Sequence, residues 1–334
     1  MSFRSKITPS IDLDGAGKRW GYLDLPHSTD RSAWGTMRIP FAVASGGAGP
    51  TLLVTGGNHG DEYEGPIAAM NLMRRLDPAQ LQGRVIIIPF LNLPAVLAGK
   101  RTSPIDDGNM NRAFPGDPDG TVTAQIAHFV TQAVLPLADT VVDIHSGGRT
   151  LNFEPFACIH NLDDQAQFER AKVALLAFAA PISLILTELD AVGMLDTTVE
   201  DMGKTFISTE LGGGGTATAA TVRIAEHGLE RLMAHMGMAE ASPAAAQTPE
   251  TRFMDNSDGN CFTASNDDGI LEMLADLGDW VEQGQPLGRI HCIPHPDQAP
   301  ATYHAKMSGR LIGRHHPGLI AQGDCFAVQA VDAA

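Results

Sequence analysis

The chain has 334 residues, of which 43% are hydrophobic and 19% charged, a composition typical of a globular protein with a sizeable core. Its formal net charge of −16 argues against nucleic acid or an anionic membrane as a partner, because both bind basic patches. We find no apolar run long enough for a transmembrane helix and no signal-peptide pattern. We therefore expect a cytoplasmic protein whose four cysteines are reduced.

Short apolar runs alternate with helical patterns over the first two thirds of the chain. Short apolar or β-branched runs without polar alternation, which are typical of strands buried on both faces, lie at 51–57, 84–90, 140–146, 182–186 and 205–212. Helical periodicity appears at 66–76, 123–138, 163–179 and 216–236. Thr123 is the predicted cap of the second of these helices. The alternation predicts an α/β fold, with a mostly parallel central sheet and helices on both faces.

A second region follows a change in composition near residues 239–251, where Ala, Pro and small polar residues predict a linker. We expect a catalytic domain over 1–250, including an N-terminal β arm over 1–45, and a smaller all-β domain over 251–334. Two stretches of this second region, at 269–293 and 309–331, share Gly-x-Leu or Gly-Ile-Leu starts and Gly-Asp or Gln-Gly turns. They predict a β-type pseudo-repeat.

Ionisable side chains follow several of the predicted strands at their carboxyl ends, where ligands bind in open α/β sheets. The segment GGNHGDEYEG (56–65) places His59 and Glu62 after the first strand, and His145 ends a later strand. Each residue alone would more often be structural, but two histidines and one carboxylate form a catalytic zinc set with one position left for water. Their joint placement predicts one zinc ion per chain. Asp143, two residues before His145 on the same strand, is the predicted hydrogen-bond partner of that histidine.

Further candidates lie beside this predicted metal site. Glu210 ends another strand, and the glycines at 212–215 let the backbone pass close to a substrate, so Glu210 is the candidate general base. The polar segment 100–117 contains Arg101, Asn111 and Arg112, which could clamp a carboxylate. An ordinary surface loop with incidental arginines is the alternative interpretation of this segment.

Five motifs together carry a resemblance to a known family: GGNHGDEYEG, FLNLPA, DDGNMNRAFPGD, DIHSGG and STELGGG. They resemble the succinylglutamate desuccinylase/aspartoacylase family, a branch of the zinc carboxypeptidase-like hydrolases. The resemblance covers roughly residues 50–215. It implies a zinc carboxypeptidase-like fold in which the zinc ligands are His59, Glu62 and His145.

The resemblance also implies roles for the remaining candidates. Glu210 would be the base that later protonates the leaving amine, and Asn111 and Arg112 would hold the substrate α-carboxylate. Arg101 would polarise the scissile carbonyl and stabilise the oxyanion. A small N-acyl amino acid is therefore the expected partner, and the sequence leaves the oligomeric state open, a homodimer included.

An overall likeness, which includes the segment at 21–35, extends to the ectoine-degrading deacetylases of this family. It implies zinc-dependent removal of the acetyl group from Nα-acetyl-L-2,4-diaminobutyrate, with an acid of unidentified position pairing with the substrate's γ-ammonium. Another N-acyl amino acid deacylase, of the aspartoacylase or succinylglutamate desuccinylase type, and a metallocarboxypeptidase are the alternatives. The C-terminal region resembles lipoyl/biotinyl β-folds, so a carrier module modified at Lys306 is a third reading.

Overall fold

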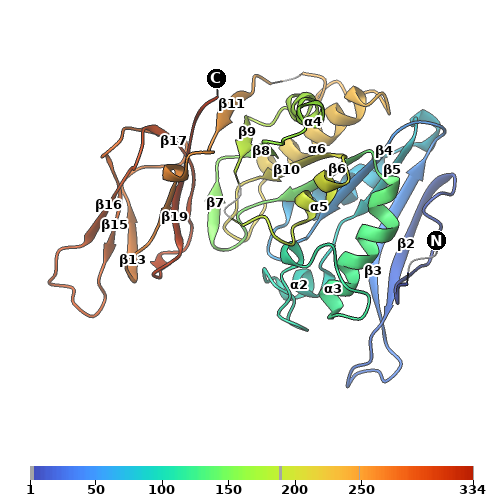
Figure 1. Ribbon diagram of the computed structural model, residues 1–334, viewed down its shortest axis with the longest axis horizontal. Helices are drawn as coiled ribbons and strands as arrows, with labels where there is room; N and C mark the ends of the chain where they lie inside the picture. Colours follow the sequence, from blue (N-terminus) through green and yellow to red (C-terminus); the bar gives the residue numbers. More distant parts are fainter. Residues whose placement is uncertain (1–3, 188–189, 248, 334) are drawn as a thin grey trace.

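The computed structural model describes residues 4–187, 190–247 and 249–333 (Figure 1). One long sheet runs through most of the described chain. In sheet order its strands are β1 (Thr8–Pro9), β2 (Gly17–Pro26), β3 (Thr36–Ser45), β5 (Arg84–Ile88), β4 (Thr51–Gly56), β6 (Thr140–His145), β10 (Thr205–Glu210), β8 (Phe156–His160), β9 (Ile182–Leu186), β11 (Arg252–Asp255), β19 (Cys325–Asp332), β17 (Gly309–His315) and β14 (Trp280–Val281). Two short strands pair off this path, β7 (Leu151–Phe153) with β17 and β12 (Phe262–Ala264) with β19.

The predicted α/β fold is confirmed, and the sheet is more mixed than the sequence indicates. Strands β5, β4, β6 and β10 are mutually parallel, whereas β3 and β8 run antiparallel to their neighbours β5 and β10. Parallel neighbours need a crossover, usually a helix. Strand β8 follows β6 through the short β7 segment with no helix between them, so the chain turns back and β8 runs in the opposite direction.

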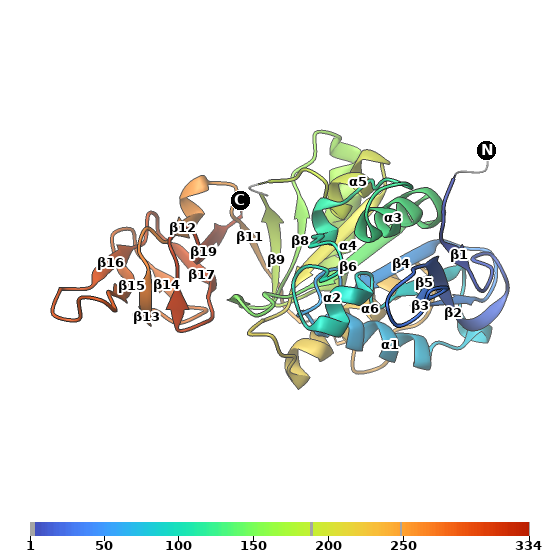
Figure 2. The ribbon, with the colours of Figure 1, turned by 90° about the horizontal axis from the view of Figure 1, so that it is seen from below.

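Helices cover both faces of the α/β part, and Figure 2 shows α1 and α6 on one side of the sheet with α3 and α5 on the other. Alternate residues of β4 feed two cores: Leu52 and Val54 pack with α1, α4 and α6, and Leu53 packs with α3 and α5. The helices are α1 (Glu64–Arg75), α2 (Leu93–Ala98), α3 (Val122–Phe129), α4 (Gln165–Phe178), α5 (Leu195–Asp201) and α6 (Ala219–His235). A π-turn (Val130–Val134) continues α3, and short 3-10 turns lie at Pro78–Gln80, Met110–Arg112, Leu135–Leu137 and Gly259–Cys261.

The start of α3 differs from the sequence prediction. Its cap is Thr121, whose side-chain oxygen accepts a hydrogen bond from the Ala124 N–H. The predicted cap, Thr123, lies inside the first turn, where its N–H and its hydroxyl both donate to Asp106 at 2.7 and 2.9 Å. Periodicity locates the helix, but the choice between two nearby threonines depends on this tertiary partner.

An antiparallel C-terminal β sheet is present as predicted, and Figure 1 shows it at one end of the molecule. Its strands are β16 (Ala301–His304), β15 (Pro286–His291), β13 (Gly269–Met273) and β18 (Leu319–Ile320). They enclose a separate small core with residues of β17 and β19. Strand β11 pairs with both β9 and β19, so the long sheet continues past the expected boundary at residue 250, which stays a prediction. Among the described residues, no helix has the length and apolar character to cross a membrane.

Candidate metal centre and active site

The loop after β4 carries His59 and Glu62 and is held tightly between β4 and α1. A Cβ at Gly56, the last residue of β4, would lie 2.7 Å from the carbonyl carbon of Gly65 in α1, so only glycine permits this approach. His59 and Glu62 are each 3% exposed. The loop thus folds both side chains inward at the carboxyl end of the sheet, next to the end of β6.

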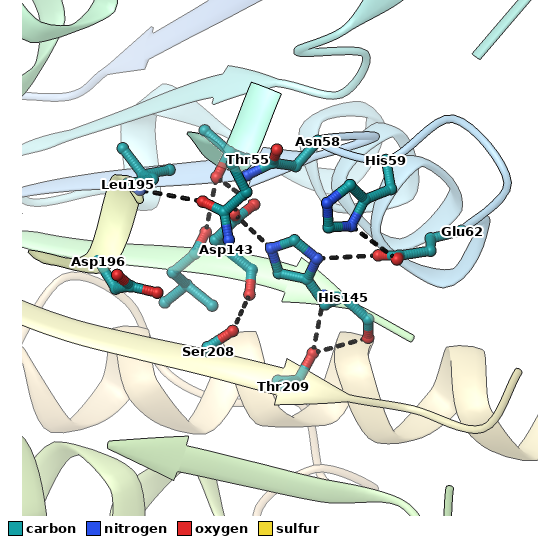
Figure 3. A network of polar contacts seen from close by, with 12 residues as sticks. Thr55, Asn58, His59, Glu62, Asp143, His145, Leu195, Asp196, Ser208 and Thr209 are labelled. Atoms are coloured by element: carbon teal, nitrogen blue, oxygen red, sulfur yellow. Dashed lines mark hydrogen bonds and ion pairs between the residues drawn. The ribbon is translucent and has the colours of Figure 1, made fainter. Parts of the chain in front are cut away.

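The three predicted metal ligands meet at this point. His59 Nδ1 lies 2.8 Å from Glu62 Oε1, and His145 Nδ1 lies 2.9 Å from Glu62 Oε2 (Figure 3). One ligand atom from each of the three residues lies within 4.8 Å of the other two. The convergence of two imidazoles and one carboxylate is the geometry expected of a metal centre with open positions.

Hydrogen bonds at the far side of each ring decide which nitrogen faces the centre. His145 Nε2 donates to Asp143 Oδ2 at 2.7 Å, and His59 Nε2 donates to Asn109 Oδ1 at 3.2 Å, because both partners are acceptors. In the neutral rings, the Nδ1 lone pairs then point at Glu62, which is itself an acceptor. Three lone-pair donors that face one another require a cation between them, so this donor set fits a divalent metal.

The electrostatics of the centre agree with this requirement. Burial lowers the pKa of His59. Burial also acts to lower the pKa of His145, but the carboxylates of Asp143 and Glu62 outweigh it and raise that pKa well above its ordinary value. Burial acts to raise the pKa of Glu62, yet the two histidines hold it below its usual range. The two buried carboxylates therefore favour positive charge at this centre.

Asp143 organises the buried layer behind His145, as the sequence predicts. Its side chain is 1% exposed and accepts 2.7 Å hydrogen bonds from Thr55, Asn58 and His145 (Figure 3). All three partners are donors. The carboxylate is therefore held in the ionised form, and burial, which acts to raise its pKa, is outweighed by these contacts, His145 foremost.

The arginines and Asn111 lie around the mouth of the centre. Arg101 Nη1 is 3.2 Å from His59 Nδ1 and 3.5 Å from Glu62 Oε1, which places a cation beside the metal position. Asn111 is buried, and its Oδ1 accepts a hydrogen bond from Leu195 N–H at 2.9 Å, so its NH₂ group is the part left to bind a ligand. The Arg112 guanidinium is oriented by the backbone carbonyl of Asn111 at 2.7 Å.

One cavity of about 120 Å³ unites the predicted site. The register of β6 and β10 sets Glu210 directly opposite His145. The cavity is lined by His59, Arg101, Asn111, Arg112, His145, Cys158, Leu186, Met194, Asp196, Ser208 and Glu210. Of the predicted metal, catalytic and substrate-binding residues, the structure brings all to this cavity except Glu62, which contacts both lining histidines. The roles assigned to these residues stay predictions.

Comparison with known proteins identifies the family. Residues 48–236 match the model of the succinylglutamate desuccinylase/aspartoacylase catalytic domain. The chain belongs to this family. It is 46% identical over 326 residues to the N-alpha-acetyl-L-2,4-diaminobutyric acid deacetylase of Halomonas elongata, covering 98% of this chain and 95% of that protein.

Two solved structures, at 48% and 37% sequence identity, share the fold over nearly the whole chain. The product-bound ectoine utilization protein EutE (DoeB) from Ruegeria pomeroyi has a TM-score of 0.96 at 48% identity, covering 99% of this chain and 100% of that one. A succinylglutamate desuccinylase/aspartoacylase from Rhodobacter sphaeroides has a TM-score of 0.93 at 37% identity, covering 98% and 100%. The likeness includes the C-terminal β region as well as the family's catalytic domain.

Two further acids of the segment at 56–65 have structural contacts. Asp61 accepts a hydrogen bond at 2.9 Å from the N–H of Arg149, in the loop that follows His145. Glu64 accepts one at 3.0 Å from the hydroxyl of Thr221, which ties α1 to α6, and burial raises its pKa. The cluster of acids after β4 thus divides into one candidate metal ligand and two residues that hold the surrounding elements.

The C-terminal region contacts the loops that follow the site strands. Strand β7, a few residues after His145, pairs with β17, and Asn152 of β7 forms a bridge with Gly213 in the loop after Glu210. Arg310 of β17 binds the Glu154 carboxylate with two guanidinium nitrogens, one of them at 2.7 Å. The appended strands therefore support both loops from outside.

Sequence reasoning did not identify Asp196 as a site residue. It is the second residue of α5, only 4% exposed, and it lines the cavity. The signal available was its place soon after the strand β9, but Asp190, Glu200 and Asp201 follow the same strand. Only the packing of α5 against the rest of the site distinguishes Asp196 from these other acids.

Proposed function

We propose that the chain is a zinc-dependent deacetylase that hydrolyses Nα-acetyl-L-2,4-diaminobutyrate to acetate and 2,4-diaminobutyrate. The observation that carries the proposal is that His59 and His145, both in contact with Glu62, line one cavity together with Glu210 and Arg101. The substrate is supported by the 46% identical relative that is named for this deacetylation.

The metal would be held by His59 Nδ1, a Glu62 oxygen and His145 Nδ1, with Asp143 and Asn109 fixing the rings from behind. A mixed imidazole and carboxylate set suits Zn²⁺. When bound, such an ion lowers the pKa of a water and polarises a carbonyl. The buried carboxylates supply the negative charge that retains it.

The general base in this proposal is Glu210, which lies opposite His145 at the cavity. Its carboxylate takes a proton from the attacking water as the oxygen–carbon bond to the acetyl group forms. It then gives that proton to the α-nitrogen as the amide C–N bond breaks, and the second proton of the water stays on the acetic acid, which leaves with the amine and ionises to acetate. One carboxylate thus serves both halves of the reaction, and no net proton is left on the enzyme.

The cationic side chains bind the two substrate groups that carry or develop negative charge, the scissile carbonyl oxygen and the α-carboxylate. Arg101, beside His59 Nδ1, donates to the carbonyl oxygen as charge develops on it. Arg112, with the NH₂ group of Asn111, binds the α-carboxylate and so fixes the acetyl group relative to Glu210. These two contacts orient the substrate across the cavity from the metal position to its far side.

Replacement of Glu210 tests the mechanism. We expect Glu210→Ala to lower kcat by about 10²–10⁴-fold, the usual contribution of a general acid–base group, while bound zinc stays near one per chain. The matched control is Glu169→Ala, which removes an exposed glutamate of α4. Loss of zinc from the Glu210 variant, or activity equal to that of the control, would contradict the role assigned to Glu210.

A further inference from the structure

We propose that Asp196 determines side-chain specificity by pairing its carboxylate with an ammonium group on the substrate side chain. The inference rests on the proposed function, because it concerns the same site and assigns the part of it that selects the amino acid. An acidic side chain at this position would make the site selective for acylated diamino acids. The family name, in contrast, refers to derivatives of the acidic amino acids glutamate and aspartate.

The position of Asp196 is fixed against the loop that carries Arg112. Asn111 Oδ1 accepts from Leu195 N–H at 2.9 Å, one residue before Asp196. Gly193 O accepts from Phe114 N–H at 3.0 Å. Gly193 has a φ of +77°, and a Cβ there would lie 2.5 Å from the Arg112 carbonyl oxygen, so the two loops are in backbone contact. The predicted α-carboxylate clamp and Asp196 are therefore held in one assembly.

The side chain of Asp196 is also restrained locally. Its Oδ1 accepts from the N–H of Thr197 at 2.5 Å and from the Thr197 hydroxyl at 3.1 Å. These contacts belong to the first turn of α5. A carboxylate at a helix start, 4% exposed and lining the cavity, is a rigid anionic group inside the site.

The charges that line the cavity match the substrate one by one. Among the described lining residues, the histidines belong to the metal centre, and the arginines face the carbonyl and the α-carboxylate in the proposed mechanism. Of the two lining acids, Glu210 is the proposed base, which leaves Asp196 as the acid without a role in that mechanism. Nα-acetyl-2,4-diaminobutyrate carries one further charge, its γ-ammonium. Because Asp196 is buried, water screens its charge only weakly, and its carboxylate therefore attracts this cation strongly.

The same carboxylate excludes substrates with acidic side chains. N-acetylaspartate or succinylglutamate would bring a second carboxylate toward Asp196, and two like charges in a small buried cavity repel each other. Asp196 would therefore act in two ways, by attracting an ammonium and by rejecting a carboxylate.

The test compares two substrates that differ only in the amine: Nα-acetyl-L-2,4-diaminobutyrate and Nα-acetyl-L-2-aminobutyrate. In Asp196→Asn, which keeps an oxygen for the Thr197 contacts, we expect kcat/KM for the first to fall at least about 30-fold, because one partner of a buried charge pair is neutralised. For the second substrate we expect a change below about threefold. Asp201→Asn, at the exposed end of the same helix, is the control and should leave both values unchanged.

The outcomes separate the specificity role from the proposed function. Equal losses on both substrates would show that Asp196 only supports the fold of the site, and unchanged values on both would show that it does not meet the amine. Either result overturns the inference while the deacetylase activity stands. A zinc-loaded wild-type enzyme that hydrolyses neither substrate would instead overturn the proposed function.

Discussion

Replacement of Asp143 by alanine should weaken metal binding without removing any ligand. The buried carboxylate accepts the Nε2–H of His145, and this bond keeps Nδ1 available to the proposed metal. Loss of such a partner typically costs about 10–100-fold in metal affinity, or about 1.4–2.7 kcal/mol. Thr55 and Asn58 also lose their acceptor, so the metal-free protein should be destabilised by about 1–3 kcal/mol for each donor left without a partner.

The affinity can be measured by competition for Zn²⁺ between the metal-free protein and a chromophoric chelator, at a temperature where the variant is folded. Asp139→Ala is the matched control. Asp139 directly precedes β6, at the end of the strand opposite to His145. Its side chain accepts a hydrogen bond from the Thr51 N–H at 2.7 Å. We expect the control to bind zinc within about twofold of the wild type. A folded Asp143→Ala protein with wild-type affinity would refute the view that this carboxylate sets the ring of His145.

Two further predictions concern the C-terminal support of the site. Glu154→Gln should lower the free energy of unfolding by about 1 kcal/mol, because it breaks a partly buried ion pair in which two nitrogens of Arg310 bind the carboxylate. Asp332→Asn, at the more exposed ion pair with Arg252, should change this free energy by less than about 0.5 kcal/mol. Denaturant unfolding measures both, and equal losses would contradict the difference. Gly213→Ala should lower kcat/KM at least about tenfold, because its Cβ would lie 2.0 Å from the Leu151 carbonyl oxygen and displace the loop after Glu210. Gly259→Ala, where nothing lies within 4 Å of the added Cβ and φ is not positive, is the control for steady-state kinetics, and similar losses in both variants would contradict a local effect.

The centre of the site could be predicted from the sequence because its residues follow strands that can be recognised by pattern. Strands β4, β6 and β10 are short runs rich in apolar and β-branched residues, and the geometry of parallel strands brings His59, His145 and Glu210 to one edge of the sheet. The partnership of Asp143 with His145 also followed from strand geometry, since residues two apart point to the same face.

Features that depend on tertiary packing could not be predicted in this way. The direction of β8 depends on the short β7 connection, and β7 is itself held by β17 from more than 150 residues later in the chain. The choice of Thr121 over Thr123 as the cap of α3 depends on Asp106. Asp196 resembles its acidic neighbours in sequence, and tertiary contacts, such as the hydrogen bond between Asn111 and Leu195, bring it to the cavity.

The most direct test of the proposed function is amine release from a small panel of substrates, before and after treatment with a chelator. The panel holds Nα-acetyl-L-2,4-diaminobutyrate, its Nγ-acetyl isomer, N-acetylaspartate, succinylglutamate and a tripeptide. We predict that the enzyme cleaves the Nα-acetyl diamino acid alone, that chelation abolishes the activity and that Zn²⁺ restores it. Cleavage that persists in fully metal-free enzyme would contradict the role of the His59–Glu62–His145 centre, and cleavage of a different member would contradict the substrate.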